Sequence, residues 1–173
     1  MEYIVFVNED GSPTGEIGPK LESHTAHTKL HLAFSCYVFN DEGEVLVTRR
    51  AETKKVWPGV WTNSVCGHPG PGEAIETAIV RRLNDELGMT VTDIKVVLPR
   101  YKYQTSPYNG IIEHEFCPVY FAKATSDVQP NPDEVAEYRW MTWDAFVAET
   151  NEDMNDVWSW WCKDQLKLLK DKV

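Results

Sequence analysis

The sequence predicts an α/β fold in which helices flank a central mixed β-sheet, with an N-terminal extension that carries metal-binding side chains. Two observations predict the sheet and helices: short apolar runs typical of strands, and one amphipathic helix that follows a glycine-rich loop. A cluster of histidines ahead of the first buried strand predicts the extension. We expect one domain across residues 1–173, with the extension at 1–32, a core at about 33–150 and a C-terminal helix at about 156–170.

The composition narrows the class of protein. A formal charge of −10 argues against a general nucleic-acid or membrane-surface binder, because either role needs a basic surface. The N-terminus lacks the pattern of a secretion signal, no apolar run approaches the ~18 residues that cross a bilayer, and the four cysteines form no CxxC pair. We therefore expect a cytoplasmic protein without a membrane or nucleic-acid partner.

The extension begins with a strand at Met1–Asn8, followed by a turn, and its second part is neither clearly strand nor helix. That second part contains His24, His27 and His31, which a helical conformation would bring near one face. Loop histidines are often simply solvent-exposed. Three of them within eight residues also suit a metal site, and both interpretations stay open.

Strands at Ala33–Asn40 and Glu44–Arg50 form a predicted hairpin across an Asp-Glu-Gly turn. Strand alternation sends the side chains of Arg49 and Arg50 to opposite faces, so one of them at most points into a given pocket. In an acidic protein the basic side chains of this region are candidate diphosphate contacts, although a solvated basic edge is the plain alternative. The candidates are Lys20, Arg50 and Lys54.

The segment from Trp57 to Met89 runs from a glycine-rich turn into a predicted helix over about Glu73–Leu87. Its apolar stripe repeats every three to four residues, and Gly88 supplies the stop. Arg82 and Glu86 share one face of this helix, near the preceding Cys66-Gly67-His68 triplet. A carboxylate flanked by arginines and facing a loop suits a metal ion that carries phosphate oxygens.

Further strands are predicted at Val91–Leu98, Arg100–Gln104 and Ile111–Lys123. In the last of these, Glu113 and Glu115 share one face of the strand while His114 takes the other. Neighbouring carboxylates repel each other unless a cation or a proton lies between them or both face solvent.

The chain closes with a predicted strand at Ala136–Met141, a helix at Thr142–Thr150 capped by Thr142, and a tryptophan-rich helix at Asp156–Lys170. Tryptophans at this density usually pack a core, and one indole can still line a pocket.

The spacing from Gly67 through Glu73, Arg81 and Glu86 to Gly88 resembles the Nudix box. Two positions depart from the box: Arg82 and Asp85 stand where glutamates are expected. Hydrolytic members use that acidic cluster to gather divalent cations and activate water, so an arginine within it argues against hydrolysis.

Other features extend the resemblance over nearly the whole chain. The resemblance is weakest after about Gln129. The histidines of the extension, the run WPGVWTNSVCGHP and the Glu113-His114-Glu115 strand closely resemble the type I isopentenyl-diphosphate isomerases, which have a Nudix-like fold. The resemblance implies a small-molecule prenyl diphosphate substrate and a monomer or weak homodimer.

The resemblance also implies roles for individual residues. His24, His31, His68, Glu113 and Glu115 match ligands of one divalent metal, which is Mn²⁺, Zn²⁺ or Mg²⁺. Glu86 and the carbonyl of Cys66 match the residues that hold a second ion, Mg²⁺, bound to the substrate diphosphate. Lys20, Arg50, Lys54 and Arg82 match the basic residues around that diphosphate. Cys66, Glu115 and Tyr103 match the residues that carry the chemistry.

Moving the double bond requires two proton carriers on opposite sides of the hydrocarbon. Cys66 would serve one side and Glu115 with Tyr103 the other, with the order left open. The carbocation-like state needs shelter from water, a role for the indole of Trp161, with Trp160 as the adjacent alternative.

Two other functions remain open from the sequence. A Nudix hydrolase is one, since Glu73, Asp85 and Glu86 leave some metal-binding capacity. A non-catalytic binding module is the other, with the histidines and glutamates serving only to fix the fold around a metal.

Overall fold

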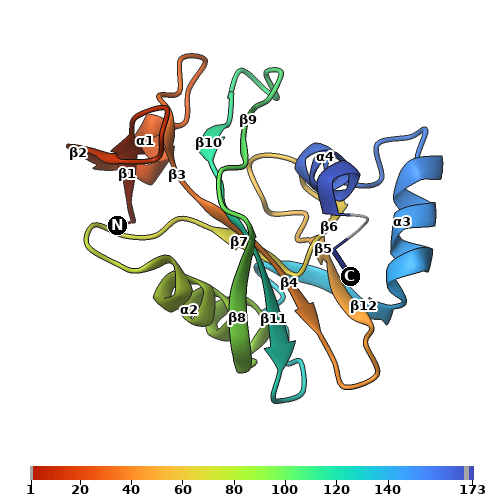
Figure 1. The fold of residues 1–173 in the computed structure, drawn as a ribbon. Coiled ribbons are helices and arrows are strands. Elements are labelled where there is room, and N and C mark those ends of the chain that lie inside the picture. Colours follow the sequence, from red (N-terminus) through yellow and green to blue (C-terminus); the bar gives the residue numbers. More distant parts are fainter. Residues whose placement is uncertain (1, 170–171) are drawn as a thin grey trace.

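The computed structural model describes residues 2–169 and 172–173, and it contains two mixed β-sheets with helices on both faces of the larger one (Figure 1). Met1 of the predicted first strand and Lys170 of the predicted last helix lie outside the described residues.

The smaller sheet is built mainly from the extension. Its strand order is β2 (Pro13–Pro19), β1 (Tyr3–Val7), β3 (His31–Leu32), β10 (His114–Phe116) and β9 (Lys102–Gln104). The short helix α1 (Lys20–Ser23) follows β2.

The larger sheet has the order β12 (Val135–Met141), β5 (Val45–Arg50), β4 (Phe34–Phe39), β11 (Val119–Ala124) and β8 (Val91–Leu98). Two short strands join it, β6 (Trp61–Thr62) beside β5 and β7 (Val65–Gly67) beside β4. The remaining helices are α2 (Ile75–Leu87), α3 (Trp143–Glu152) and α4 (Trp160–Leu169).

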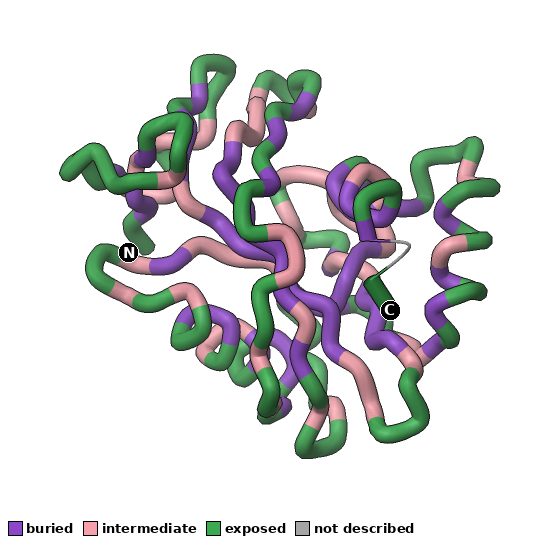
Figure 2. The backbone as a smooth tube through the Cα atoms, viewed as in Figure 1, coloured by how far each residue is buried: buried purple, intermediate pink, exposed green. Residues whose placement is uncertain are grey.

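Strand β4 is buried over most of its length (Figure 2), and its alternating side chains pack into apolar clusters on both faces of the larger sheet. Tyr37 packs towards α3 and α4, with its ring centroid 6.1 Å from that of Phe146. Cys36 and Val38 pack on the opposite face, in the cluster that contains Ile79 of α2. Two apolar layers therefore hold β4 in the centre of the molecule.

Helix α2 confirms the predicted amphipathic helix, with its first helical residue at Ile75 rather than Glu73. Gly88 ends it in the left-handed region at φ 56°, and its amide donates to the carbonyl of Asn84. Thr142 likewise caps α3 as predicted, since its side chain accepts from the amide of Ala145.

The expectation of one strand over Ile111–Lys123 is wrong. The segment divides at Cys117-Pro118 into β10 and β11, which belong to different sheets. Residues 31–39 divide in the same way, at Ala33, and the two segments run parallel: β3 pairs with β10 and β4 with β11. Because proline lacks an amide hydrogen, Pro118 suits a point where the ladder is interrupted.

Three further differences concern element boundaries. The two strands of the predicted hairpin separate directly after the turn, since Phe39 and Val45 form the only residue pair between β4 and β5. The last helix begins at Trp160 rather than Asp156, and the strand predicted from Arg100 begins at Lys102. Strand β2 was not predicted, because most of its residues are exposed and give no apolar alternation.

Within the described part of the chain, every helix falls short of the length and apolarity that a membrane crossing requires.

Candidate active site

A cavity of about 330 Å³ brings together nearly all the predicted site residues. They come from α1, β5, β7, α2, β9, β10 and α4, and from the loops next to α1, β5, β7 and β10. The predicted residues that line it are Lys20, His24, Arg50, Lys54, Cys66, His68, Arg82, Glu86, Tyr103, Glu113, Glu115 and Trp161. His31 does not line the cavity; it is fully buried and touches residues that do.

Four of the five predicted ligands of the first metal converge on one point. His24, His31, His68 and Glu115 each offer a donor atom within 4.8 Å of the others. The Nε2 atoms of His31 and His68 are 3.2 Å apart, and Nε2 of His68 is 3.0 Å from Oε1 of Glu115. Imidazole nitrogens with a carboxylate fit a divalent cation, so the described residues form a group able to hold a metal ion.

Backbone carbonyls orient two of these imidazoles. Nδ1 of His24 lies 2.6 Å from the carbonyl oxygen of Lys20, and Nδ1 of His31 lies 2.9 Å from that of Lys29. A carbonyl only accepts, so each Nδ1 carries a hydrogen, and Nε2 is the atom of each ring that would bind a cation.

The electrostatics of the cluster differ between its members. Burial lowers the pKa of His68 to about 4 and also lowers the pKa of His24, so both imidazoles are neutral at pH 7. Burial would lower the pKa of His31 too, but the hydrogen bond and charge of Glu115 outweigh it and raise that pKa. Burial would raise the pKa of Glu115, but hydrogen bonds to His31 and His68 hold it well below its usual value.

Glu113, the fifth predicted ligand, is linked to the cluster through Tyr103. The Tyr103 hydroxyl lies 2.9 Å from Oε2 of Glu113 and 2.9 Å from Oε2 of Glu115. Both carboxylates therefore face the same side, as the strand pattern predicted, and His114 contributes nothing to the cavity lining. Burial, together with the neighbouring charge of Glu115, raises the pKa of Glu113 to about 7.

Cys66 presents a protonated thiol to the cavity, since burial raises its pKa to about 12. Its Sγ lies 3.2 Å from Oδ1 of Asn63 and 3.3 Å from Oγ of Ser35. The sulfur is thus a hydrogen-bonded group rather than a simple apolar contact.

Carboxylates pair with three of the four basic residues that line the cavity. Lys20 pairs with Glu2 at 2.8 Å, Lys54 pairs with Glu134, and Arg82 reaches Glu86 with Nε at 2.9 Å. Arg82 also lies 3.4 Å from Glu134. An anion that enters the cavity meets these three cations and Arg50. Glu134 already bridges two of them, Lys54 and Arg82.

Arg50 lies beside the predicted indole. It donates to the carbonyls of Val56 and Trp57, and its guanidinium carbon is 5.7 Å from the ring centroid of Trp161. Trp161 is buried and lines the cavity, while Trp160 is 44% exposed and does not. Arg49 points the other way and pairs with Glu52 and Glu137, which confirms the predicted alternation.

The other two acidic residues of the box do not line the cavity: Glu73 is hydrogen-bonded to its own neighbours, and Asp85 faces solvent. Glu73 accepts from both Nε and Nη2 of Arg81 and from the amide of Gly70, which ties the His68 loop to α2. Asp85 is exposed and does not line the cavity. Gly67 allows the side chain of Arg82 to lie close to the backbone of β7, because a Cβ at this position would lie 2.9 Å from Cγ of Arg82.

Sequence reasoning missed several residues that contact the predicted ones. Asn63 lies in the quoted run around Cys66, so that run offered a signal for it. Ser35 and Gln165 are distant in sequence and read as ordinary buried polar residues, and Glu134 lies in a polar loop. Only the folded chain brings them to the site.

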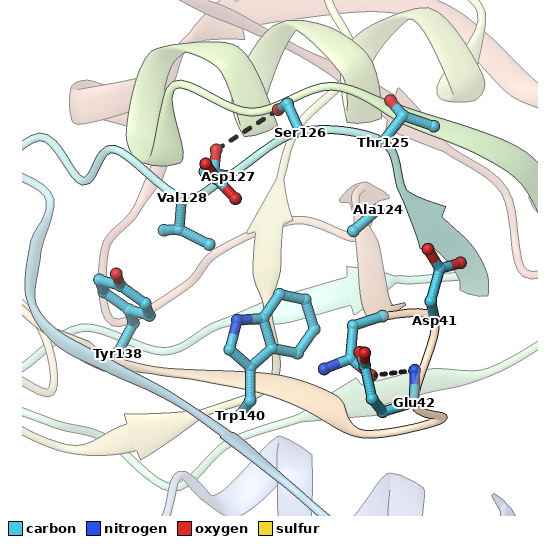
Figure 3. A pocket seen from close by; sticks show the side chains of 10 residues that line it. Asp41, Glu42, Ala124, Thr125, Ser126, Asp127, Val128, Tyr138 and Trp140 are labelled. Atoms are coloured by element: carbon cyan, nitrogen blue, oxygen red, sulfur yellow. Dashed lines mark hydrogen bonds between the residues drawn. The ribbon is translucent and has the colours of Figure 1, made fainter.

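A second hollow, of about 510 Å³, lies where the β4–β5 turn, the loop after β11 and β12 meet (Figure 3). Tyr138 and Trp140 stand beside acidic side chains there, and none of the predicted site residues lines it.

Known proteins resemble this chain over most of its length. The family profile described as NUDIX domain matches residues 29–161. A Paenarthrobacter aurescens protein named isopentenyl-diphosphate Delta-isomerase is 51% identical over 160 residues, which cover 92% of this chain and 86% of the relative. A Saccharopolyspora erythraea protein with the same name is 48% identical over 169 residues, which cover 98% of this chain and 86% of the relative.

Solved structures share the fold at lower identity. A Deinococcus radiodurans crystal structure superimposes with a TM-score of 0.70 at 18% identity, covering 98% of each chain. A MutT protein from Methanosarcina mazei gives a TM-score of 0.62 at 18% identity, covering 83% of this chain and 94% of its own. The predicted Nudix-like fold is confirmed.

Proposed function

The chain belongs to the Nudix family and, within it, to the isopentenyl-diphosphate Delta-isomerases, and on that premise we propose that its cavity interconverts isopentenyl and dimethylallyl diphosphate. One observation carries the proposal: a single cavity joins a cluster of cations, a thiol and a pair of hydrogen-bonded carboxylates. These are the groups that hold a diphosphate and move protons on either side of an alkene.

The basic residues that line the cavity bind the diphosphate. Lys20, Arg50, Lys54 and Arg82 supply positive charge there, in a protein whose formal charge is −10. Glu86, which accepts from Arg82, and the Cys66 carbonyl would hold Mg²⁺ that arrives with the substrate. This arrangement extends the hydrocarbon towards Cys66, Glu115 and Trp161.

Cys66 and Glu115 carry the protons. One of them protonates the terminal CH₂ carbon of the double bond, which leaves a tertiary carbocation at the neighbouring carbon. The other removes a proton from the CH₂ group that joins this cationic carbon to the rest of the chain. Tyr103 bonds both Glu113 and Glu115, so it orients the carboxylate that faces the hydrocarbon. The buried indole of Trp161 shelters the cation and stabilises it with its π face.

The His/Glu cluster would hold the other divalent ion, the first metal named above, which is Mn²⁺, Zn²⁺ or Mg²⁺, with His24, His31, His68 and Glu115 as ligands and Glu113 beside them. When bound, the ion fixes the position of Glu115 and tunes its acidity. The residues themselves determine the rest of the geometry, because two backbone carbonyls and Tyr103 already orient them.

The proposal is tested by proton and phosphorus NMR of the purified protein with isopentenyl diphosphate and Mg²⁺ in deuterium oxide. We expect dimethylallyl diphosphate with deuterium incorporated and the diphosphate intact, and no product from Cys66→Ala or Glu115→Gln. Release of phosphate instead would establish a hydrolase. An unchanged spectrum from a metal-loaded, folded protein would leave a binding module.

We further propose one domain over residues 1–173 that acts in the cytoplasm as a monomer or weak homodimer, without nucleic-acid or membrane partners. The free cysteines suit a reducing compartment, and the formal charge of −10 opposes binding to polyanions. Light scattering during size-exclusion chromatography tests the oligomeric state.

A further inference from the structure

The thiol of Cys66 stands at the end of a buried hydrogen-bond chain that crosses the core to α4. The Tyr37 hydroxyl donates to Oε1 of Gln165 at 2.8 Å, and Nε2 of Gln165 donates to Oγ of Ser35 at 2.9 Å. Oγ of Ser35 lies 3.3 Å from the sulfur of Cys66. Ser35 and Gln165 are at most 1% exposed, so water does not compete for these bonds.

The direction of each hydrogen bond follows from the chemistry of its partners. Because the Gln165 amide nitrogen only donates, the Ser35 oxygen accepts from it and the Ser35 hydrogen points elsewhere. Two sulfurs lie within reach of that hydrogen, Cys66 at 3.3 Å and Cys117 at 3.5 Å. Ser35 therefore donates to a thiol, and the Cys66 sulfur is the nearer acceptor.

Asn63 fixes the other side of the sulfur. Its amide nitrogen donates to the carbonyls of Cys36 and Val65, at 3.0 and 2.9 Å. These two bonds fix the orientation of the amide group, and the acceptor Oδ1 therefore faces the other way. Oδ1 accepts from Thr62 at 2.9 Å and from the Cys66 thiol at 3.2 Å. The Cys66 sulfur thus accepts on one side and donates on the other, and its remaining direction opens to the cavity.

We propose that Ser35 and Asn63 are positioning residues that hold the Cys66 sulfur in its working orientation, with Gln165 directing the Ser35 hydroxyl. The proposal rests on the proposed function of Cys66 as a proton carrier. Neither Ser35 nor Asn63 lines the cavity, so neither is expected to contribute to substrate binding. Their loss acts on the chemical step, because a cysteine side chain freed from both partners rotates away from the reacting carbon.

Ser35→Ala tests the proposal, and Ser64→Ala is its matched control. Ser64 is as buried as Ser35 and its hydroxyl is also hydrogen-bonded, but it accepts from the amide of Val38 and donates to the carbonyl of Leu46. We expect Ser35→Ala to lower kcat by about 10- to 100-fold and to leave KM within about twofold. Ser64→Ala should keep both constants near the wild-type values.

The S–H stretching band of Cys66 provides a readout independent of turnover. It is isolated as an infrared difference between each protein and the same protein carrying Cys66→Ala. The band should shift in Ser35→Ala and stay in place in Ser64→Ala. Should Ser35→Ala fail to fold, Gln165→Met keeps the hydroxyl but removes the amide that directs it, and should shift the band in the same way.

An unmoved band, or a kcat no lower than that of Ser64→Ala, overturns the positioning role. A rise in KM at constant kcat also overturns it, since that result would place Ser35 in substrate binding. If the wild-type protein gives no isomerisation while the band still shifts in Ser35→Ala, the proposed function fails and the hydrogen-bond geometry stands.

Discussion

Arg49 and Arg50 are neighbours in β5 whose side chains point to opposite faces of the sheet. Arg50 lines the cavity beside Trp161, whereas Arg49 forms surface ion pairs with Glu52 and Glu137. The two positions therefore offer the same chemical change on the same strand with different expected consequences.

We predict that Arg50→Lys weakens binding of Mg²⁺-diphosphate by about tenfold, because lysine loses the planar fork that bonds phosphate and the loop carbonyls together. Isothermal titration with inorganic diphosphate measures the affinity without turnover. Arg49→Lys should bind as the wild type does. Equal losses in the two variants would show that charge alone matters and that the cavity-facing position does not.

The loop between α3 and α4 is held by one carboxylate. Asp153 accepts hydrogen bonds from the amides of Asn155, Val157 and Trp158, and Lys163 lies 3.2 Å away. Burial would raise the pKa of Asp153, but these amides outweigh it and lower the pKa. The charged form is thus favoured by folding, and the loop delivers α4, with Trp161, to the cavity.

Asp153→Asn should lower the free energy of unfolding by about 1–3 kcal/mol at pH 7. Since the folded-state pKa is lowered, the stabilisation is fully present above the unfolded pKa of about 3.9 and is lost as the pH falls through the folded value. The difference between the two proteins should therefore shrink below about pH 4. Urea unfolding measures this difference in the free energy of unfolding. Asp156→Asn is the control, because the side chain of Asp156 is 93% exposed.

The elements that sequence predicts well are those whose signals are local. Helix α2 has an apolar stripe and a terminal glycine, and α3 has a capping threonine, so both were found within two residues. The single strand over 111–123 was wrong because the change of sheet at Pro118 depends on where residues 31–39 lie. Likewise, the proposed ligands of the cluster followed from a family pattern, while Ser35 and Gln165 became visible only through contacts distant in sequence.

On the scale of the whole molecule, the His/Glu cluster joins the two sheets. His31 and Glu115 lie in the smaller sheet, His24 follows α1, and His68 follows β7 of the larger sheet. A metal ion bound to these four would connect three separate parts of the chain.

We predict that a divalent ion at 100- to 1,000-fold above its dissociation constant stabilises the protein by about 3–4 kcal/mol, and that a chelator removes this gain. Thermal unfolding with and without Zn²⁺ or Mn²⁺ measures it. His24→Ala should abolish the response, whereas His27→Ala, an exposed histidine three residues away, should keep it. A response that survives in His24→Ala would contradict the ligand set.

The parallel pairing of residues 31–39 with 114–124 also bears on how the protein folds. The chain between these segments must be ordered or looped out before they meet, so the pairing is non-local and carries a large loop-closure entropy. Local elements such as α2 can form without it. We therefore expect His31 and Glu115 to come together late in refolding, so that the capacity to take up a metal ion reports the last kinetic step rather than the first.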